Sequence, residues 1–525
     1  MLFTILFFIF AWRRLDWAVM FLIATLPAYL IRFNVFGLPS TILEAMIWIV
    51  FMVWIINNFG RVKNNFLENF KKNNQKIKIR YPFDWEMVLL LLIALMAVSV
   101  AGFSSSSFGI WKAYFFEPVL FFIVVLNVFK YNAKAANEMR MPRMKYPLEK
   151  ILWSLAISAL TVSALAIYQK LTGAFIDNPA WADENTRRVV SFFGYPNAVG
   201  LYLGPLVLVM IGWLFNVILE RSESGAIGSQ GDSIGRRWRS FLQNDKMRIV
   251  FIALIIIMSV FSIYFAKSKG ALLGVATGLI IFGLMASKKI RYATIILLLL
   301  IGFGLAVYQS ARNLAVENIT FSNLSGQIRK AGWSDTWRML KNGHLITGAG
   351  LANYQAAVAP YHTEGIFFKD PNDPEAQRKL VFNEAYRTAH WQPLEIYLYP
   401  HNIILNFWSE LGLAGLLIFI WIIFKYFWLG ISGLSLRGAN ADPSPPTDGS
   451  GQASQSYEQD DRRLLRSLQS LAMTDKFLLL GLICAMVVII IHGLVDAPYF
   501  KNDLAVMFWL FMAMMSLIKL ESLNN

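Results

Sequence analysis

The sequence has very little cysteine and little charge for a chain of 525 residues. Its single cysteine, Cys484, lies in an apolar run and has no second cysteine with which to form an intrachain disulfide. Any external loop must therefore be held by packing alone. Charged residues make up only 15% of the chain, whereas 56% are hydrophobic and 15% are aromatic. Soluble domains carry about 25% charged residues, so this composition excludes an ordinary soluble fold.

A basic segment is missing in front of the first apolar run, Met1–Ala11, and no small-residue cleavage site follows it. We therefore interpret this run as a start-transfer or interfacial segment and not as a cleaved signal peptide. The formal net charge is +15. Because Lys and Arg gather in short connections that all fall on one side of a membrane, the positive-inside rule explains this charge, and we expect no nucleic-acid partner.

Apolar runs long enough to span a lipid bilayer recur along the whole chain. A bilayer core takes roughly 20 apolar residues in a helix. The runs lack the polar and apolar alternation of membrane β-strands, so we expect an all-α integral membrane protein. Twelve spans place every strongly basic connection on one side, and the first span is the least sharply defined. The expected spans are Trp17–Ile31, Pro39–Ile56, Trp85–Phe103, Trp111–Phe129, Ile151–Leu171, Ala198–Leu219, Ile249–Ala266, Gly270–Ala286, Tyr292–Tyr308, His401–Trp428, Phe477–Val495 and Leu504–Ile518.

These spans divide the chain into three parts. Residues 1–308 form a transmembrane bundle of spans 1 to 9, residues 309–400 form a large extracytoplasmic loop, and residues 401–525 contain spans 10 to 12. Two segments rich in Ser, Gly or Pro, residues 220–248 and 430–473, are interpreted as cytoplasmic linkers. A loop of about ninety residues is usually functional or disordered, and helix-like stretches at Ile328–Lys341 and Pro374–His390 favour a folded, partly helical cap.

The loop ends at a histidine where a span meets water. Pro400 suits the first position of a helix, so His401 beside it is expected at the positive end of that helix. The helix dipole disfavours an imidazolium ion there, so we expect a neutral ring that can accept a proton. The alternative is a histidine that only caps the span at the membrane interface.

A carboxylate follows on the same helix, nine residues after the histidine and about 13 Å deeper. An ionised Glu410 at that depth costs about 2.5 to 3.5 kcal/mol unless it is paired, so we expect a partner from another span. Gly412 and Gly415 are expected to allow a close helix approach there. A structural polar pair is the alternative to a direct catalytic role.

Three cations fall on the outer side in this topology. Lys269 lies at the outer end of a tight hairpin, where it either contacts the phosphate groups of a substrate or only reaches up to lipid phosphates. Arg329 lies four residues before Trp333, and Arg188 lies nine before Asn197. An exposed surface arginine is the alternative interpretation of each.

The last histidine, His492, lies four residues before Asp496 on one expected helix face, which favours either an orienting pair or a polar cluster that ends the helix. The remaining histidines, His344, His362 and His390, show no zinc-ligand spacing. We therefore expect no catalytic metal and no other cofactor.

Several of these motifs together resemble the O-antigen ligase and O-antigen polymerase family. The main resemblance is His401 and Asn402 with Glu410, Gly412 and Gly415, which is similar to the family's signature after its large periplasmic loop. Three further segments resemble the family in the same chain order: Arg188 to Asn197 with its Phe-Gly and Pro-Asn pairs, Arg329 with Trp333 followed by Gly348 to Tyr354, and His492 to Asp496.

The resemblance implies a membrane glycosyltransferase of the C-type class in the cytoplasmic (inner) membrane. Its donor is an undecaprenyl-diphosphate-linked glycan, and its acceptor is a lipid, glycan or protein hydroxyl at the outer leaflet. By this resemblance His401 activates the acceptor, and the three cations bind the donor diphosphate. The supporting residues are Asn402, Glu410, Asn197, His492 and Asp496. One departure is Ser268-Lys269-Gly270, where the family usually has Ser-Arg-Gly, and a lysine lacks the bidentate fork of arginine.

Other functions stay open at this point. Ligases and polymerases share these motifs, and a protein O-oligosaccharyltransferase differs only in its acceptor. A secondary transporter predicts broken helices and paired charges near the membrane midplane, whereas the ionisable residues here gather mostly at the outer interface. Glu410 is the main residue that favours a transporter. A purely structural assembly partner leaves the ordered set of outer motifs unexplained.

Overall fold

The computed structural model describes residues 2–35, 38–71, 81–138, 145–224, 245–371, 373–439 and 476–522. Helices dominate this part of the chain, and its β structure consists of two short, two-stranded antiparallel sheets. Nine helices in the described residues are long and apolar enough to cross a membrane. They correspond to the fourth to twelfth expected spans, so the expected all-α polytopic membrane protein is confirmed. The nine are Ser105–Phe129, Leu148–Thr172, Pro196–Leu219, Asp245–Phe265, Lys269–Ala286, Lys288–Val307, Ile403–Leu434, Lys476–Gly493 and Asn502–Lys519.

In the first hundred residues the first expected span differs from the structure, whereas helices overlap the second and third expected spans. The expected helix Trp17–Ile31 is wrong, because α2 (Leu15–Ala24) ends before Thr25, whose hydroxyl donates to the Phe21 carbonyl at 2.8 Å. Pro27, which has no N–H for a helical bond, lies in the following 3₁₀ turn. The other elements here are α1 (Leu2–Arg13), η1 (Leu26–Leu30), β1 (Arg32–Val35), β2 (Leu38–Thr41), α3 (Ile42–Lys71) and α4 (Asp84–Val100).

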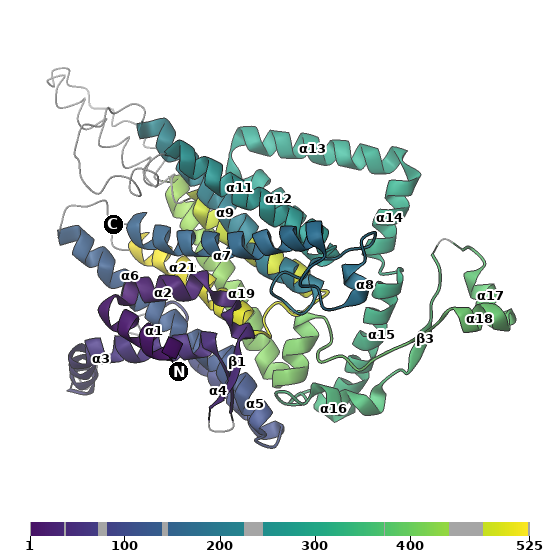
Figure 1. The fold of residues 1–525 in the computed structure, drawn as a ribbon, viewed down its shortest axis with the longest axis horizontal. Coiled ribbons are helices and arrows are strands. Elements are labelled where there is room, and N and C mark those ends of the chain that lie inside the picture. The colour runs from purple at the N-terminus through teal and green to yellow at the C-terminus, as the bar shows by residue number, and fades with distance from the viewer. Residues whose placement is uncertain are drawn as a thin grey trace.

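The middle of the bundle is formed by helices from distant parts of the chain. The 18 most apolar consecutive residues of each helix show which helices lie inside the bundle. They are 94% buried in α21 (Asn502–Ser522), 83% buried in α9 (Pro196–Ser224) and 0% buried in α13 (Lys288–Val307). Trp509 of α21 packs its ring 5.4 Å from the ring of Phe122. Figure 1 shows α21 among the other long helices and α13 at the edge. The remaining bundle elements are α5 (Ser105–Ile110), η2 (Trp111–Phe116), α6 (Glu117–Glu138), α7 (Lys145–Thr172), α8 (Pro179–Ala182) and α11 (Asp245–Phe265).

The glycines of α12 (Lys269–Ala286) pack against neighbouring helices, as small residues do at close helix contacts. A Cβ atom on Gly274 would lie 3.1 Å from the Val488 carbonyl oxygen, and one on Gly270 would lie 2.6 Å from the His492 ring. Only three residues separate α11 from α12, which confirms the expected tight hairpin. This packing places the start of α12 beside the end of helix Lys476–Gly493.

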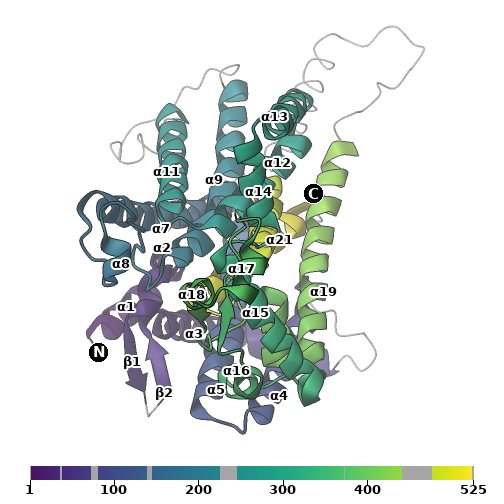
Figure 2. The same ribbon diagram turned by 90° about the vertical axis from the view of Figure 1, so that its right-hand side faces the viewer.

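The long loop is folded and partly helical. Its two helix-like stretches are confirmed by α15 (Leu324–Met339) and by the pair α17 (Ala376–Phe382) and α18 (Glu384–Ala389). In Figure 1, α14 and α15 run across one end of the bundle, and an arm containing β3, α17 and α18 projects beyond them. The view in Figure 2 shows these elements in front of the bundle. The other loop elements are α14 (Gln309–Ile319), η3 (Leu340–His344), α16 (Tyr354–Val358), η4 (Ala359–Tyr361), β3 (Gly365–Phe367) and β4 (Trp391–Pro393).

A kink in α19 (Ile403–Ala439) receives the loop. Gly412 has φ of +73°, a left-handed conformation that suits glycine, and the freed Leu413 N–H donates to the Ile346 carbonyl at 2.9 Å. Gly348, with φ of +67°, lies so close that a Cβ atom there would be 2.7 Å from the Gly412 nitrogen. Gly412 therefore allows the loop to approach α19 closely, whereas the sequence predicts the close approach of a neighbouring helix.

Parts of the expected organisation lie outside the described residues. The structure does not describe residues 225–244 of the expected linker 220–248, nor residues 440–473 of the expected linker 430–473. The division into 1–308, 309–400 and 401–525 stays a prediction.

Candidate active site

His401 lies just before α19, at the junction of the loop and the bundle. The expected helix start at Pro400 is wrong, because α19 begins at Ile403 and His401 has φ of +48°. Asn402 caps the helix instead: its side-chain oxygen accepts from the N–H groups of Ile404 at 3.0 Å and Leu405 at 3.1 Å. The histidine therefore precedes the cap, and its immediate charged neighbour is a side chain rather than the helix terminus.

That neighbour is Asp496, which follows helix Lys476–Gly493 and is fully buried. Its Oδ1 lies 3.5 Å from the buried Nδ1 of His401, and its Oδ2 accepts from the Asn197 amide at 3.2 Å. The Asn197 oxygen in turn accepts from Arg188 at 3.4 Å. Four residues from three separate motifs therefore form one connected chain, in the order Arg188, Asn197, Asp496 and His401.

The carboxyl group of Asp496 is held in its ionised form. Burial alone would raise its pKa, but the close contact and charge of His401, together with the Ala497 N–H, outweigh burial and lower the pKa of Asp496 to about 2. The carboxylate is therefore negative at neutral pH and faces the imidazole ring directly. A carboxylate in this position fixes the orientation of a histidine and stabilises it when it takes up a proton.

Arg329 brings a second cation to this centre from α15. Burial lowers the pKa of Arg329, and burial together with repulsion from Arg329 lowers the pKa of Arg188. None of the salt bridges formed among the described residues includes either guanidinium group. Two partly desolvated arginines that repel one another would be stabilised by an anion placed between them.

Lys269 lies at the start of α12 and is joined to the loop. Its ammonium group donates to the Asn318 oxygen at 2.8 Å, and Asn323 donates to the same oxygen at 3.2 Å. Asn323 caps α15, which carries Arg329, by accepting from the Gly326 N–H at 2.8 Å. The described contacts therefore link Lys269 to the beginning of α15, and they do not join it directly to His401.

Glu410 is engaged by the loop and not by another span, so our expectation of a partner from a second helix is wrong. Its carboxylate accepts from the Ala352 N–H at 2.7 Å and is 5% exposed. Ala352 has φ of +61°, which turns its N–H toward α19. This contact fixes the loop at the kink of α19, and it removes the main observation that favoured a transporter.

His492 lies beside this centre but does not pair with Asp496 through a hydrogen bond. The ring is 2% exposed, its Nδ1 has no hydrogen-bond partner in the described residues, and Gly270 packs against its edge. The described contacts of Asp496 lead to His401, Asn197 and the Ala497 N–H. The expected orienting pair of His492 with Asp496 is therefore wrong, and Asp496 faces His401 instead.

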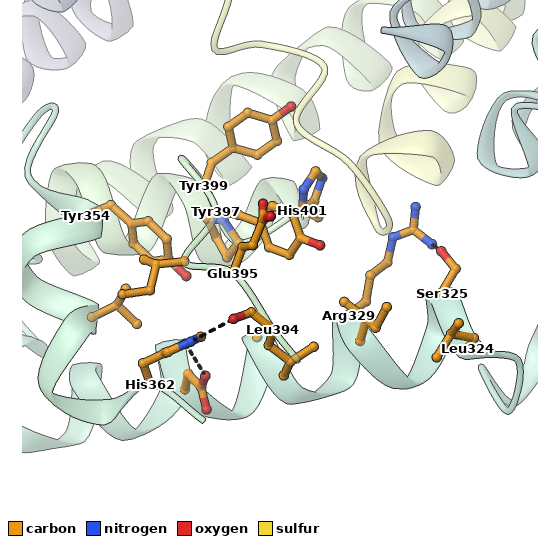
Figure 3. A pocket seen from close by; sticks show the side chains of 16 residues that line it. Leu324, Ser325, Arg329, Tyr354, His362, Leu394, Glu395, Tyr397, Tyr399 and His401 are labelled. Atoms are coloured by element: carbon orange, nitrogen blue, oxygen red, sulfur yellow. Dashed lines mark hydrogen bonds and ion pairs between the residues drawn. The ribbon is translucent and has the colours of Figure 1, made fainter. Parts of the chain in front are cut away.

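A cavity of about 340 Å³ opens beside His401, between α15 and the segment that precedes α19. Figure 3 shows Arg329 and Ser325 toward one end, Tyr354 and His362 toward the other, and His401 between the two ends. The remaining lining residues are Leu324, Ile328, Gly332, Asp335, Val358, Leu394, Glu395, Ile396, Tyr397, Tyr399 and Pro400.

The aromatic residues around His401 were not singled out in the sequence. The ring of Tyr399 lies 4.7 Å from that of His401, and the ring of Tyr397 lies 5.0 Å away. Tyr399 also donates to the hydroxyl of Tyr195 at 3.4 Å, and Trp333 donates to the Pro400 carbonyl at 2.9 Å. The sequence feature that could have indicated them is the pair of tyrosines just before the histidine. Both rings contact the His401 ring from the loop.

Metal-binding groups are not gathered here. In the residues that the structure describes, no three His, Cys, Asp or Glu side chains lie close enough together to hold a metal ion. The expectation of chemistry without a metal or other cofactor stays a prediction.

Comparison with known proteins agrees with the resemblance found in the motifs. Residues 253–420 match the family model described as O-Antigen ligase, a range that includes Lys269, Arg329, His401 and Glu410. A Rickettsia conorii protein with the provisional name polysaccharide ligase is 27% identical over 185 residues. That match covers 35% of this chain and 40% of the relative's length. The resemblance predicted from the sequence is therefore confirmed, and it covers residues 253–420, which are similar to the O-antigen ligase family.

Proposed function

We propose that this protein transfers an undecaprenyl-diphosphate-linked oligosaccharide or polysaccharide to an acceptor hydroxyl on the outer face of the cytoplasmic membrane. The observation that carries the proposal is the arrangement of His401 against Asp496, connected through Asn197 to Arg188, with Arg329 at the same cavity. The match of residues 253–420 to the O-antigen ligase family supports it.

In this function His401 is the general base. Asp496 faces Nδ1, so Nδ1 carries the proton and Nε2 is the nitrogen that accepts a proton from the acceptor hydroxyl. As that proton moves to Nε2, the acceptor oxygen forms a bond to the anomeric carbon of the donor sugar. The bond between that carbon and the phosphate oxygen breaks, and the lipid diphosphate leaves with its electron pair.

The cations stabilise the charge that develops on the leaving diphosphate. Arg188 and Arg329 are partly desolvated and have no carboxylate partner among the described residues, so their charges are available to an anion. Arginine suits this role because its planar fork contacts two phosphate oxygens at once. Lys269 assists from the start of α12, either directly or by holding Asn318 and the beginning of α15.

The proposal is tested by replacing the base. His401→Ala, reconstituted in proteoliposomes with a lipid-diphosphate-linked glycan and an acceptor, is expected to insert and fold but to lose transfer by at least a hundredfold. His390→Ala is the matched control, because His390 lies in the arm, where its Nδ1 faces the Tyr386 carbonyl at 2.8 Å. Normal transfer by His401→Ala at matched protein level would remove this histidine from the mechanism.

The acceptor class is tested in the host. Deletion of the gene followed by gel analysis of surface glycans distinguishes a ligase, which is expected to leave no attached glycan, from a polymerase, which is expected to leave one attached unit. Incubation of membranes with candidate proteins detects a protein acceptor as glycan-shifted bands. Unchanged glycans in the deletion strain would contradict all three transferase functions.

A further inference from the structure

The two ends of the cavity beside His401 differ in charge. One end carries the guanidinium of Arg329, whose Nη1 donates to the Ser325 hydroxyl at 2.8 Å. Toward the other end lie Tyr354 and His362, while Glu395 lines the wall below His401 (Figure 3). Glu395 takes part in none of the salt bridges found among the described residues. The cavity therefore has a cationic end at Arg329 and, beside His401 in its middle, a carboxylate without an ion-pair partner among the described residues.

The wall that carries Glu395 is held by hydrogen bonds from three parts of the loop. His362 Nε2 donates to the Leu394 carbonyl at 3.2 Å, and Gln355 donates to the Ile396 carbonyl at 2.9 Å. The third bond is the one from Trp333 to the Pro400 carbonyl at 2.9 Å. Because the backbone on both sides of Glu395 is fixed, the place of this residue in the cavity wall is set before any ligand binds.

The far end of the cavity rests on a small apolar cluster. Tyr354 is 4% exposed, and its hydroxyl bonds to that of Thr336 at 2.7 Å, while Val358 packs in the same cluster. Tyr397, by contrast, is 40% exposed and presents its ring beside Glu395. An aromatic face with a carboxylate acceptor next to it matches a sugar ring, which has apolar C–H faces and hydroxyl donors at its edge.

We propose that the part of the cavity beside and beyond His401, formed by Glu395, Tyr397, Tyr354 and His362, binds the terminal sugar of the acceptor, and that this sugar carries no phosphate. The inference rests on the proposed function. A diphosphate requires the cationic end at Arg329, and the acceptor hydroxyl must reach His401, so the acceptor sugar extends from His401 toward Tyr354 and His362. Beside His401 the Glu395 carboxylate accepts hydrogen bonds from sugar hydroxyls and repels a phosphorylated sugar.

The test compares two acceptor glycans that differ only in a phosphate on the terminal sugar. The full chain in proteoliposomes, supplied with a lipid-diphosphate-linked glycan donor, is expected to use the neutral acceptor at least tenfold better in kcat/KM. Glu395→Gln is expected to raise KM for the neutral acceptor about tenfold and to leave KM for the donor unchanged. The ratio of kcat/KM between the neutral and the phosphorylated acceptor should become smaller. Glu375→Gln, a carboxylate on the arm outside the cavity, is the matched control.

Several outcomes would overturn this assignment. If the wild-type protein transfers glycan but Glu395→Gln keeps the wild-type acceptor KM and discrimination, the acceptor subsite is wrong and the proposed function stands. If Glu395→Gln changes KM for the donor instead, the carboxylate lies on the donor side. If the wild-type protein transfers nothing, both the function and the subsite fail. Binding of the neutral acceptor to His401→Ala, measured by saturation-transfer NMR, should persist and should weaken when Glu395→Gln is added.

Discussion

The most specific prediction of this structure concerns Asp496→Asn. The substitution keeps the shape of the side chain and its capacity to accept from Asn197, but it removes the negative charge 3.5 Å from the Nδ1 of His401. If His401 takes up a proton during transfer, that charge stabilises the transition state more than the ground state. The variant should therefore fold normally and lose catalytic rate rather than substrate affinity.

The size of the loss follows from the pKa of the carboxyl group. Its pKa is about 2 in the fold against an ordinary value of 3.8. This difference corresponds to a preference on the order of 2 kcal/mol for the carboxylate beside His401. If an interaction of that order acts in the transition state, kcat should fall by roughly ten- to a hundredfold at pH 7. Asp496 stays ionised far below neutral pH, so an assay at pH 7 compares a carboxylate with a neutral amide.

The assay is steady-state transfer in proteoliposomes, with kcat and KM measured separately for donor and acceptor. Asp503→Asn is the matched control, because Asp503 is a second buried carboxyl residue, at the start of α21, and its Oδ1 has no hydrogen-bond partner in the described residues. A kcat for Asp496→Asn within threefold of the wild type would refute the reasoning, provided that both variants are equally abundant and equally resistant to heat.

Three further predictions test other contacts. Arg329→Lys should raise KM for the lipid-diphosphate donor about tenfold in the same assay, because the ammonium group cannot form two parallel phosphate bonds, and an unchanged KM would place the diphosphate elsewhere. Gly348→Ala should lower the free energy of unfolding by about 2 kcal/mol or more, because the positive φ of Gly348 and the nearby Gly412 nitrogen leave no room for a Cβ atom. Thermal unfolding in detergent measures this change, and a variant as stable as the wild type would contradict the packing of the loop against α19. Lys269→Ala should raise KM for the donor severalfold and Lys269→Arg should preserve it, whereas wild-type kinetics for the alanine variant would favour contact with lipid phosphates alone.

The membrane spans were predictable because long apolar runs are a local property of the sequence. The nine long helices fall where hydropathy placed them, and the tight turn before Lys269 is confirmed. The expected first span failed because Thr25 and Pro27 interrupt the helix, a local effect that average hydropathy does not register. The helix ends were less predictable. The sequence predicts that a helix begins at Pro400, but Asn402 caps α19, which begins at Ile403.

The site residues were predictable by type, but their partners were not. The motifs identified His401, Asp496, Asn197 and Arg188, yet no sequence spacing indicates that Asp496 contacts His401, which lies 95 positions earlier in the chain. Glu410 shows the same limit, because its partner is the backbone of Ala352, and a backbone N–H can be supplied by any residue other than proline. Glu395 was missed because a single acidic residue in a loop carries no local signal.

The most direct test of the account is the position of the donor diphosphate in the protein itself. A cryo-electron microscopy structure of the full chain in lipid nanodiscs, with a short-chain polyprenyl diphosphate bound, should show both phosphate groups within about 4 Å of Arg329 or Arg188. The same structure should place His401 on the side of the cavity that faces the acceptor. Phosphate density away from both arginines, or a diphosphate bound where the His401 ring cannot reach the sugar, would contradict the account.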